Sequence, residues 1–280
     1  MSTCYVIATP IGNLQDMTPR AVETLKSVSA IFAEDTRVSA KLLVHFGIQC
    51  PLISLHEHNE MSRVEKIKAM LEAGESVAII SDAGTPLISD PGFTVVRHLR
   101  ELGFLVVPIP GVSAIITALS VAGIPTDRFT FIGFLPSKKG QRRTELDLLS
   151  TVEHTQVFYE SSHRIVAMLE DLRESFGDDR AIFVGREMTK RFEDYRFGTA
   201  KELHEHYATH DSEIRGEFVV ATTGKEKSAE SESGFDSEKL LKALMAEKLP
   251  LKQISTILHK VTGRAKNELY QELLALKDEE

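Results

Sequence analysis

Short apolar runs alternate with amphipathic stretches along the first 122 residues of the chain. The runs have the length and composition of strands buried on both faces of a sheet, and they cover residues 4–8, 30–33, 52–55, 77–80 and 105–109. The stretches between them repeat apolar residues at helical spacing, and two of them end at Gly74 and Gly103, as helices often do. Strands that alternate with helices predict an α/β domain built on a parallel sheet.

Residues 76–92, with the sequence SVAIISDAGTPLISDPG, form the central stretch of this domain. After the predicted strand, small residues with one glycine and one proline leave bare backbone against which a ligand can lie. Ser89 and Asp90 followed by Pro91 are typical of an N-cap and a first helical residue, so we expect a helix to begin there. Taken alone, the loop fits an ordinary connection as well as it fits a ligand site.

Four loops follow predicted strands, and they begin near Pro10, Asp35, Asp82 and Pro110. The carboxyl ends of parallel strands lie at one edge of the sheet, which is where open α/β sheets bind ligands. The loop at Pro110 also leads into a helix N-terminus, where free backbone N–H groups favour polar or anionic atoms. By itself, Asp35 indicates only a cap for the next helix. Together the loops predict a pocket that is rich in backbone and poor in bulky side chains.

The pattern changes after residue 128. Short strands are expected at 129–134, 156–159, 181–186, 195–197 and 217–222, and helices at 141–149, 165–176 and 201–207. Because some strands follow one another directly, we predict a second α/β domain with more antiparallel character. A polar, linker-like stretch, KEKSAESESG, precedes three amphipathic helices at 238–247, 251–259 and 265–276. The expected organisation is two α/β domains at 1–122 and 123–224, a linker at 225–235 and a small helical domain at 236–280.

Composition and charge limit the classes of function. With 42% hydrophobic and 26% charged residues, the chain is typical of a soluble globular protein, and no apolar run approaches a membrane span. The N-terminus is unlike a signal peptide, and the isolated Cys4 and Cys50 fit a reducing cytoplasm. The net charge of −8 argues against indiscriminate nucleic-acid binding but leaves room for a local basic patch.

Several common motifs are missing from the sequence. It contains no G-x-G-x-x-G after a strand, no phosphate-binding P-loop and no hydrolase nucleophile elbow. Histidines with ligand-like spacing occur at His56 and His58 and at His204, His206 and His210. They stand in polar surroundings without a cysteine or carboxylate frame, so we interpret them as solvated surface and predict no metal site.

A series of motifs, taken in order, resembles the tetrapyrrole-methylase family and, within it, the ribosomal branch. The motifs are TPIGN at 9–13, AEDTR at 33–37, SDAGTP at 81–86, PIPGVSA at 108–114, FIGFLP at 131–136, FYESSHR at 158–164, REMTK at 186–190 and RGEFV at 215–219. The resemblance extends from Tyr5 to about Thr223. Tetrapyrrole-modifying relatives have a Gly-Gly-Asp-Pro type of loop where this chain has DAGTP at 82–86, a departure that favours the ribosomal branch over porphyrin substrates.

The resemblance implies two α/β domains of the tetrapyrrole-methylase type with the cofactor cleft between them. It also implies a homodimeric enzyme that uses S-adenosylmethionine to methylate the ribose 2′-hydroxyl of a cytidine in the decoding region of 16S rRNA, in the small ribosomal subunit. The cofactor-binding residues that it implies are Pro10, Asp82, Ala83, Gly84, Pro86, Leu87, Ile88, Ser113, Ala114, Phe134, Gly216 and Glu217.

The chemistry of such a reaction requires a group that draws a proton from the acceptor. Methyl transfer from a sulfonium is a direct displacement, and a sugar hydroxyl is a poor nucleophile that stays protonated at neutral pH. Glu187 and Lys190 are the catalytic candidates, with Glu34 or Asp35 as alternatives. Lys190 is suited only if burial and neighbouring arginines lower its pKa. An ion pair with a neighbouring arginine explains Glu187 equally well.

Basic side chains supply the expected contacts with RNA phosphates, and they are Arg37, Lys138, Lys139, Arg142, Arg143, Arg186 and Arg191. A further run is either an RNA surface or a solvated face, and it comprises Lys248, Lys252, Lys260, Arg264 and Lys266. Tyr159 or Phe134 is suited to stack on a base exposed for reaction. Two alternatives remain open: a methylase of the same fold that acts on a tetrapyrrole, and a non-catalytic RNA-binding assembly factor.

Overall fold

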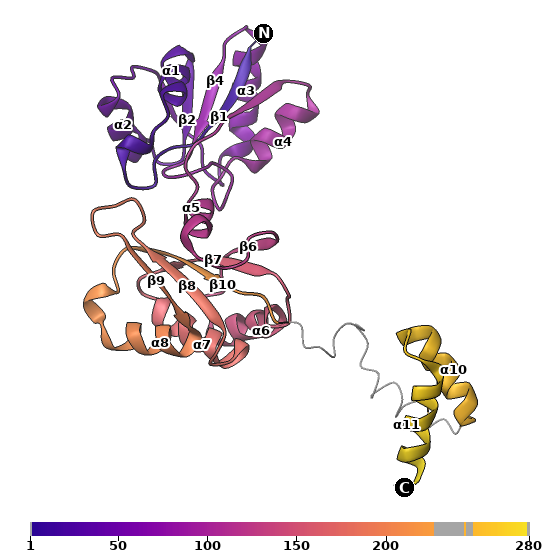
Figure 1. Cartoon of the computed structure of the whole chain (residues 1–280). Helices are drawn as coiled ribbons and strands as arrows, with labels where there is room; N and C mark the ends of the chain where they lie inside the picture. The colour runs from indigo at the N-terminus through magenta and orange to yellow at the C-terminus, as the bar shows by residue number, and fades with distance from the viewer. Residues whose placement is uncertain (1, 227–243, 245–248, 279–280) are drawn as a thin grey trace. The chain divides into compact units, whose positions relative to one another are not determined.

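The computed structural model describes residues 2–226, 244 and 249–278, and the chain divides into two compact units, residues 1–224 and 225–280 (Figure 1). The first unit contains two lobes, each built on a five-stranded sheet. The predicted helix at 238–247, apart from residue 244, and linker residues 227–235 lie outside the described residues. None of the described helices has both the length and the apolar composition that crossing a membrane requires.

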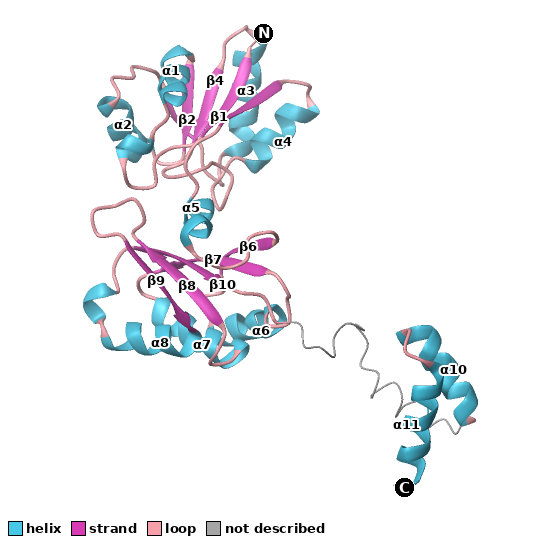
Figure 2. Cartoon of the chain, in the orientation of Figure 1, coloured by secondary structure: helices cyan, strands magenta, loops and turns pink. Residues whose placement is uncertain are grey.

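The first lobe is a parallel sheet with helices on both faces (Figure 2). The strand order is β3-β2-β4-β1-β5, with β1 at Thr3–Ile7, β2 at Ala30–Ala33, β3 at Leu52–Ser54, β4 at Val77–Ile80 and β5 at Leu105–Ile109. Around them lie the short η1 at Leu14–Asp16, α1 at Pro19–Ser27, α2 at Thr36–His45, α3 at Glu60–Glu72 and α4 at Phe93–Glu101. Every strand pair is parallel, which confirms the predicted α/β architecture.

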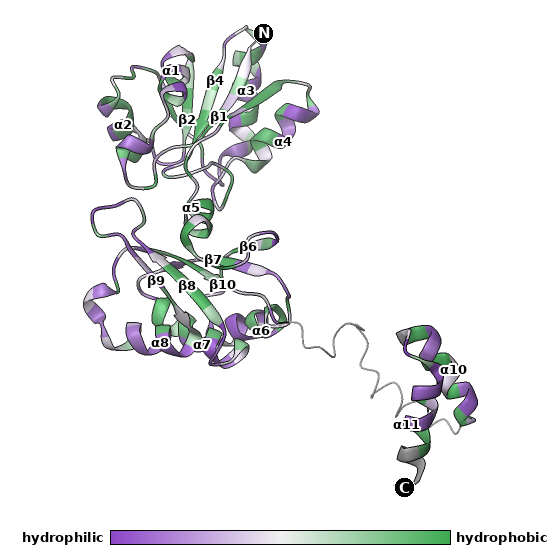
Figure 3. Ribbon diagram, viewed as in Figure 1, coloured by the Kyte–Doolittle hydropathy of each residue, from purple (hydrophilic) through white to green (hydrophobic). Residues whose placement is uncertain are grey.

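Alternation along the strands explains why both faces are covered. Ile31 and Ile80 pack with Leu25 of α1 and Leu43 of α2 in one buried cluster. Their strand neighbours Phe32 and Ile79 pack with helices α3 and α4 in another cluster. Because successive side chains of a strand point to opposite faces, continuous apolar strands require a helical layer on each side. Figure 3 shows hydrophobic residues concentrated in these strands.

The second lobe has the strand order β6-β7-β10-β8-β9, in which only β6 and β7 are parallel. Its elements are β6 at Phe129–Phe134, α6 at Lys139–Leu149, β7 at Thr155–Ser161, α7 at Ile165–Phe176, β8 at Ala181–Arg186, β9 at Asp194–Thr199, α8 at Ala200–Thr209, the short η2 at Asp211–Glu213 and β10 at Glu217–Thr222. The predicted antiparallel character is therefore confirmed. Helix α6 begins earlier than predicted.

Helix α5, Ala114–Val121, follows the last strand of the first sheet but packs on the second sheet. Ile115 and Leu119 lie in a buried cluster with Val157 of β7 and Phe183 of β8. Helices α6, α7 and α8 cover the opposite face of that sheet. Figure 1 shows α5 between the two lobes. The predicted boundary at residue 122 assigns this helix to the first domain, whereas its apolar side chains pack on the second sheet.

The start of α4 corrects one prediction. Ser89 and Asp90 do not cap the helix, and Pro91 is not its first residue, because α4 begins at Phe93 with Gly92 as its N-cap. The chain passes through Ser89 and Gly92 with φ of 66° and 119°, which delays the helix. The cap comes from another helix instead: the Glu60 carboxylate accepts hydrogen bonds from the backbone of the first turn.

The second unit contains α10, Leu251–Thr262, and α11, Lys266–Asp278. Ile254 and Leu258 of α10 pack against Leu269 and Leu273 of α11 in a small buried core. Gly263 ends α10 with a φ of 73°, a conformation that glycine adopts at least cost.

Arg142 is a structural residue rather than an RNA contact. Its side chain is 5% exposed, and its Nε donates at 2.6 Å to the fully buried carboxylate of Asp171 on α7. A second donor group of the same guanidinium reaches the Ser137 carbonyl at 3.3 Å. The prediction that Arg142 contacts RNA phosphates is wrong, because a side chain with these partners does not reach solvent.

We expect Arg142→Ala to lower the free energy of unfolding by about 3 kcal/mol, because it leaves the buried Asp171 charge with only the more distant Lys139 ammonium, at 3.8 Å. The adjacent Arg143→Ala is the matched control, since Arg143 pairs with Glu174 on the surface. That variant is expected to cost at most about 1 kcal/mol. Denaturant unfolding of both variants is the measurement, and equal costs contradict the structural role of Arg142.

Candidate active site

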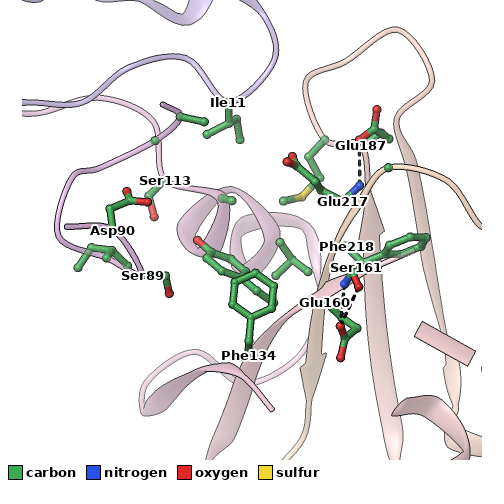
Figure 4. Close-up of a pocket in the computed structure, with 18 of the residues that line it drawn as sticks. Ile11, Ser89, Asp90, Ser113, Phe134, Glu160, Ser161, Glu187, Glu217 and Phe218 are labelled. Atoms are coloured by element: carbon green, nitrogen blue, oxygen red, sulfur yellow. Dashed lines mark hydrogen bonds between the residues drawn. The ribbon is translucent and has the colours of Figure 1, made fainter. Parts of the chain in front are cut away.

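A cavity of about 380 Å³ lies between the two lobes of the first unit (Figure 4). This volume is within the roughly 300–1,000 Å³ typical of small-molecule sites. The lining residues come from the strand-end loops of both lobes: Ile11, Ala83, Gly84, Thr85, Ile88, Ser89, Asp90, Ser113, Ala114, Phe134, Tyr159, Glu160, Ser161, Glu187, Met188, Lys190, Gly216, Glu217, Phe218 and Val219.

The loops of the first lobe are fastened to one another by hydrogen bonds. The backbones of Thr9 and Gly84 exchange two bonds of 2.9 and 3.0 Å, and Thr9 Oγ1 donates to the Ser81 carbonyl at 3.2 Å. Thr85 Oγ1 donates to the Val112 carbonyl at 3.0 Å. Gly84 has a φ of 80°, which favours glycine at this position. Three of the four predicted loops are thus held together at the cavity wall.

Strained backbone is concentrated around this cavity. In the described part of the chain, the non-glycine residues with positive φ are Leu87, Ser89, Glu187 and Thr189. The first two lie in the loop between β4 and α4, and the other two lie in the loop between β8 and β9. For a bulky residue such as Leu87 or a β-branched one such as Thr189 this conformation is a genuine outlier. Such residues gather at functional sites, which independently favours this cavity as the site.

Glu187, Lys190 and Glu217 form a hydrogen-bonded group on the second lobe. Lys190 Nζ donates to Glu187 Oε1 at 2.7 Å and to Glu217 Oε2 at 2.9 Å. The Glu217 backbone N–H donates to the same Glu187 Oε1 at 3.0 Å, a bond drawn in Figure 4. Within residues 2–226, none of the hydrogen bonds reaches Glu187 Oε2. That oxygen is therefore available to a further donor.

These contacts determine the ionisation of the two catalytic candidates. Burial disfavours the charged forms, but the hydrogen bonds from Lys190 and from the Glu217 backbone outweigh it and lower the pKa of Glu187. Burial has the opposite effect on the pKa of Lys190 and lowers it, but the hydrogen bonds of Lys190 to Glu187 and Glu217 outweigh burial and raise this pKa above its usual value. Glu187 is a carboxylate and Lys190 an ammonium at neutral pH. The lowered pKa on which a base role for Lys190 depends is therefore absent from this arrangement, and its part in catalysis stays a prediction.

Two glycines make room for this group. A Cβ on Gly216, which has a φ of 83°, overlaps with the Glu187 carboxylate, and a Cβ on Gly12 overlaps with the Lys190 side chain. The Lys190 side chain therefore packs directly on the first loop of the opposite lobe. This close approach is visible only in the folded structure, because Gly12 and Lys190 are far apart along the chain.

Acidic groups lie on the first lobe as well. Burial and the nearby Asp82 raise the pKa of Asp90 to about 6, although a hydrogen bond from Ser81 works in the opposite direction. Burial, with Asp82 and Asp90, also raises the pKa of Glu34, which does not line the cavity. Asp35 caps α2, and hydrogen bonds from Arg37 lower its pKa to about 2. Asp35 is therefore a poor candidate for a base.

Two aromatic side chains, Phe134 and Tyr159, line the same cavity as Asp90. The Phe134 and Tyr159 rings pack edge to face with centroids 5.6 Å apart, and Phe131 lies 4.8 Å from Tyr159 in the same arrangement. Burial raises the pKa of Tyr159 to about 12, so the hydroxyl stays protonated. Phe134 remains more than half exposed and is available for stacking.

The structure brings most of the predicted cofactor residues to the cavity and leaves others behind its wall. Ala83, Gly84, Ile88, Ser113, Ala114, Phe134, Gly216 and Glu217 line it, whereas Pro10, Asp82, Pro86 and Leu87 do not. The Asp82 carboxylate instead accepts a hydrogen bond of 3.0 Å from the Asp35 backbone. Sequence reasoning missed Asp90 and Glu160: the first resembled a helix cap, and the second lies within the motif at 158–164.

The remaining predicted RNA contacts do not line the cavity. Arg186 pairs across the strands with Phe218, whose ring packs in the helix-covered core, so its side chain lies on that face rather than in the cleft. Lys139 and Arg143 form ion pairs with Glu170 and Glu174. Lys138, Arg191 and Arg37 are exposed. The Arg191 guanidinium lies over the Phe192 ring, and the Arg37 side chain is 88% exposed.

Comparison with known proteins shows similarity along nearly the whole chain. The family model of the tetrapyrrole (corrin/porphyrin) methylases matches residues 3–204, and that of the RsmI C-terminal HTH domain matches residues 232–277. The protein named ribosomal RNA small subunit methyltransferase I of Pseudomonas aeruginosa is 47% identical over 273 residues, 97% of this chain and 96% of its own length. Its namesake from Escherichia coli O157:H7 is 44% identical over 95% of this chain and 93% of its own.

Solved structures share the fold at low sequence identity. A cobalt precorrin-4 methyltransferase of cobalamin biosynthesis matches with a TM-score of 0.59 and 16% identity, over 79% of this chain and 94% of its own. A uroporphyrin-III-C-methyltransferase from Thermus thermophilus matches with a TM-score of 0.53 and 17% identity, over 80% and 94% of the two chains. At these identities the likeness concerns the two-lobed architecture alone.

Proposed function

The chain belongs to the tetrapyrrole methylase family, in its ribosomal RNA small subunit methyltransferase I branch, and from this premise we propose its reaction. It transfers a methyl group from S-adenosylmethionine to the ribose 2′-hydroxyl of a cytidine in 16S rRNA of the small ribosomal subunit, as a cytoplasmic homodimer. The observation that carries the proposal is the cavity between the lobes, where bare backbone of one lobe faces the Glu187 carboxylate of the other.

The residues around the cavity fit this donor. S-adenosylmethionine supplies a reactive methyl group on a positively charged sulfur. Among the lining residues, the carboxyl groups of Asp90, Glu187 and Glu217 outnumber the single cation Lys190, which suits a cationic ligand. The buried Glu160 carboxylate is already paired with Arg164. The Ala83–Thr85 backbone lies against the cavity without large side chains, and Ser113 precedes the free N-terminus of α5 without making a capping bond. We propose that the Ala83–Thr85 backbone, Asp90 and Ser113 of the first lobe hold the donor.

The second lobe prepares the acceptor. We assign Glu187 Oε2 as the atom that accepts the hydrogen bond of the ribose hydroxyl and draws off its proton during transfer, an effect worth about 10²–10⁴-fold. Lys190 holds the carboxylate through Oε1 and keeps it ionised. Positioning of the hydroxyl against the methyl group lowers the activation barrier further, by roughly 7–11 kcal/mol in well-oriented reactions. Phe134 and Tyr159 provide the stacking surface for the flipped base.

The phosphate contacts are proposed at exposed cations. Lys138, Arg37 and Arg191 are exposed on the first unit. On the second unit, residues 249–267 contain Lys252, Lys260, Arg264 and Lys266 and no acidic residue. This segment, called the basic turn below, comprises α10, the turn at 263–265, in which Arg264 also pairs with Glu272, and the start of α11. It lies within the match to a helix-turn-helix family, a fold that contacts nucleic acids through its second helix.

Replacing Lys252, Lys260 and Lys266 together by alanine is expected to raise the KM for small subunits by roughly 10-fold, with kcat and donor affinity unchanged. Phosphate contacts release counterions, so the slope of log affinity against log salt falls by roughly 0.7–0.9 for each lysine–phosphate pair that the substitutions remove. The matched control replaces Lys26, Lys41 and Lys66, exposed lysines of the first lobe. Identical salt slopes for both triple variants and the wild type contradict an RNA contact at the basic turn.

Donor binding is expected to strengthen as the pH rises from 5 to 7. The Asp90 carboxyl, with a pKa of about 6, is neutral below that pH and negative above it, where it attracts the positively charged donor. The gain is roughly 5-fold, in line with about 1 kcal/mol for a partly exposed ion pair. Calorimetric titration of the donor across this range is the measurement. The affinity of the Asp90→Asn variant for the donor is expected to stay constant over this range. An equal rise in affinity in both proteins shows that Asp90 does not cause the pH dependence.

The proposed reaction is tested by incubating the protein with radiolabelled S-adenosylmethionine and small subunits that lack the modification, followed by nucleoside analysis. Label on the 2′-oxygen of a cytidine is the expected result. Label on a base contradicts the proposed acceptor. RNA binding without any label identifies a non-catalytic assembly factor, and transfer to a tetrapyrrole acid but not to RNA identifies a small-molecule methylase.

A further inference from the structure

Glu60 is a buried carboxylate that the proposed chemistry does not use. It begins α3 and is 9% exposed, which is rare for a glutamate. Its Oε1 accepts from the Gly92 backbone N–H at 2.8 Å, and its Oε2 accepts from the Thr94 backbone N–H at 2.9 Å. Gly92 is the N-cap of α4 and has no side chain to cap it. One carboxylate from α3 therefore satisfies two free N–H groups at the positive end of α4.

Gly92 is also the last residue of the loop that forms one wall of the cavity. The first part of this loop is held by the bonds of Thr9 to Gly84 and of Thr85 to Val112. The second part contributes Ile88, Ser89 and Asp90 to the lining and contains Leu87 and Ser89 at positive φ. Such a backbone persists only where its surroundings hold it, because it is unfavourable for these side chains. A hydrogen bond from Ser81 holds Asp90, and Glu60 holds the backbone that follows it, at Gly92 and Thr94.

We propose that Glu60 is a positioning residue for donor binding: by fastening Gly92 and Thr94 to α3 it keeps the strained segment Leu87–Asp90 in the shape that forms the cavity wall. The inference rests on the proposed function, because it takes the cavity to be the donor site. Glu60 itself does not line the cavity, so its effect passes through the loop.

The test compares Glu60→Ala and Glu60→Gln with two variants of the same helix. Glu65→Gln removes an exposed charge from α3, and Val64→Ala removes buried apolar volume from its core face without touching the loop. Glutamine keeps one acceptor oxygen but turns donor hydrogens toward the second backbone N–H, so an intermediate effect is expected. The full chain is used, with calorimetric titration of S-adenosylmethionine and hydrogen exchange of the backbone amides in the absence of donor.

For Glu60→Ala we expect the donor dissociation constant to rise about 10-fold or more, in keeping with the loss of two hydrogen bonds to a charged group. The amides from Leu87 to Thr94 are expected to exchange faster, whereas those of the first sheet keep their protection. In kinetics the KM for the donor rises and kcat at saturation changes little. Val64→Ala lowers the melting temperature but leaves donor affinity and loop exchange as in the wild type.

Two results separate this inference from the proposed function. If the wild type binds the donor and Glu60→Ala binds it equally well with unchanged loop exchange, Glu60 has no positioning role. If the wild type fails to bind the donor, the proposed function fails, and the exchange measurement still shows whether Glu60 holds the loop. A loss of affinity in Val64→Ala as large as that in Glu60→Ala reduces the effect to general stability and overturns the inference.

Discussion

Replacing Gly84 by valine is expected to weaken S-adenosylmethionine binding by about 100-fold, equal to about 2.8 kcal/mol. Gly84 has a φ of 80°, and its two backbone bonds to Thr9 prevent it from moving to a conformation that valine prefers. A new Cβ also lies 3.4 Å from Ile11 Cγ2, so the larger branches of valine push the cavity walls apart. Calorimetric titration of the donor measures the effect directly.

Gly103→Val is the matched control for this prediction. Gly103 has the same φ of 80°, lies between α4 and β5, and has nothing within 4 Å of an added Cβ. Both variants therefore carry a similar backbone strain, of the order of 1–3 kcal/mol. Only Gly84→Val is expected to lose donor affinity. If Gly103→Val loses as much, the effect reports stability alone, and if neither loses affinity the donor binds elsewhere.

Replacing Glu187 by glutamine is expected to lower kcat by roughly 10²–10³-fold while the donor dissociation constant changes no more than about 3-fold. The amide keeps the shape of the side chain and one acceptor oxygen for Lys190, but it no longer draws a proton from the acceptor hydroxyl. Single-turnover transfer to small subunits, with the enzyme in excess, measures the chemical step apart from product release.

Glu205→Gln serves as the control for this variant, because it removes an exposed carboxylate from α8 in the same lobe. It is expected to transfer the methyl group at the wild-type rate. Glu187 sits at a φ of 49° beside Gly216, so the folded state of the glutamine variant is checked by its melting temperature. A Glu187→Gln enzyme with unchanged single-turnover rate removes this carboxylate from the reaction and leaves positioning as the source of catalysis.

The location of the candidate cavity could be predicted from local patterns, whereas the state of its charged groups could not. Glycine and proline after β4 and β5 marked bare loops, and the parallel sheet placed them at one edge. The ionisation of Lys190 depends on Glu217, a residue 27 positions away in the sequence. Burial of Arg142 depends in the same way on Asp171, 29 positions away. A run of basic residues has the same sequence pattern whether its side chains bind phosphates or carboxylates, so the sequence does not identify their partners.

Sequence by itself determined the alternation of strands and helices in this protein, and with it the loops that outline the cavity, because apolar spacing and turn residues act within a few positions. Tertiary structure alone decided that α5 covers the second sheet, that Glu60 caps α4 from 32 positions away and that Lys190 stays charged. The physical reason is that hydrogen bonding, burial and pKa depend on neighbours in space, and folding chooses those neighbours from distant parts of the chain.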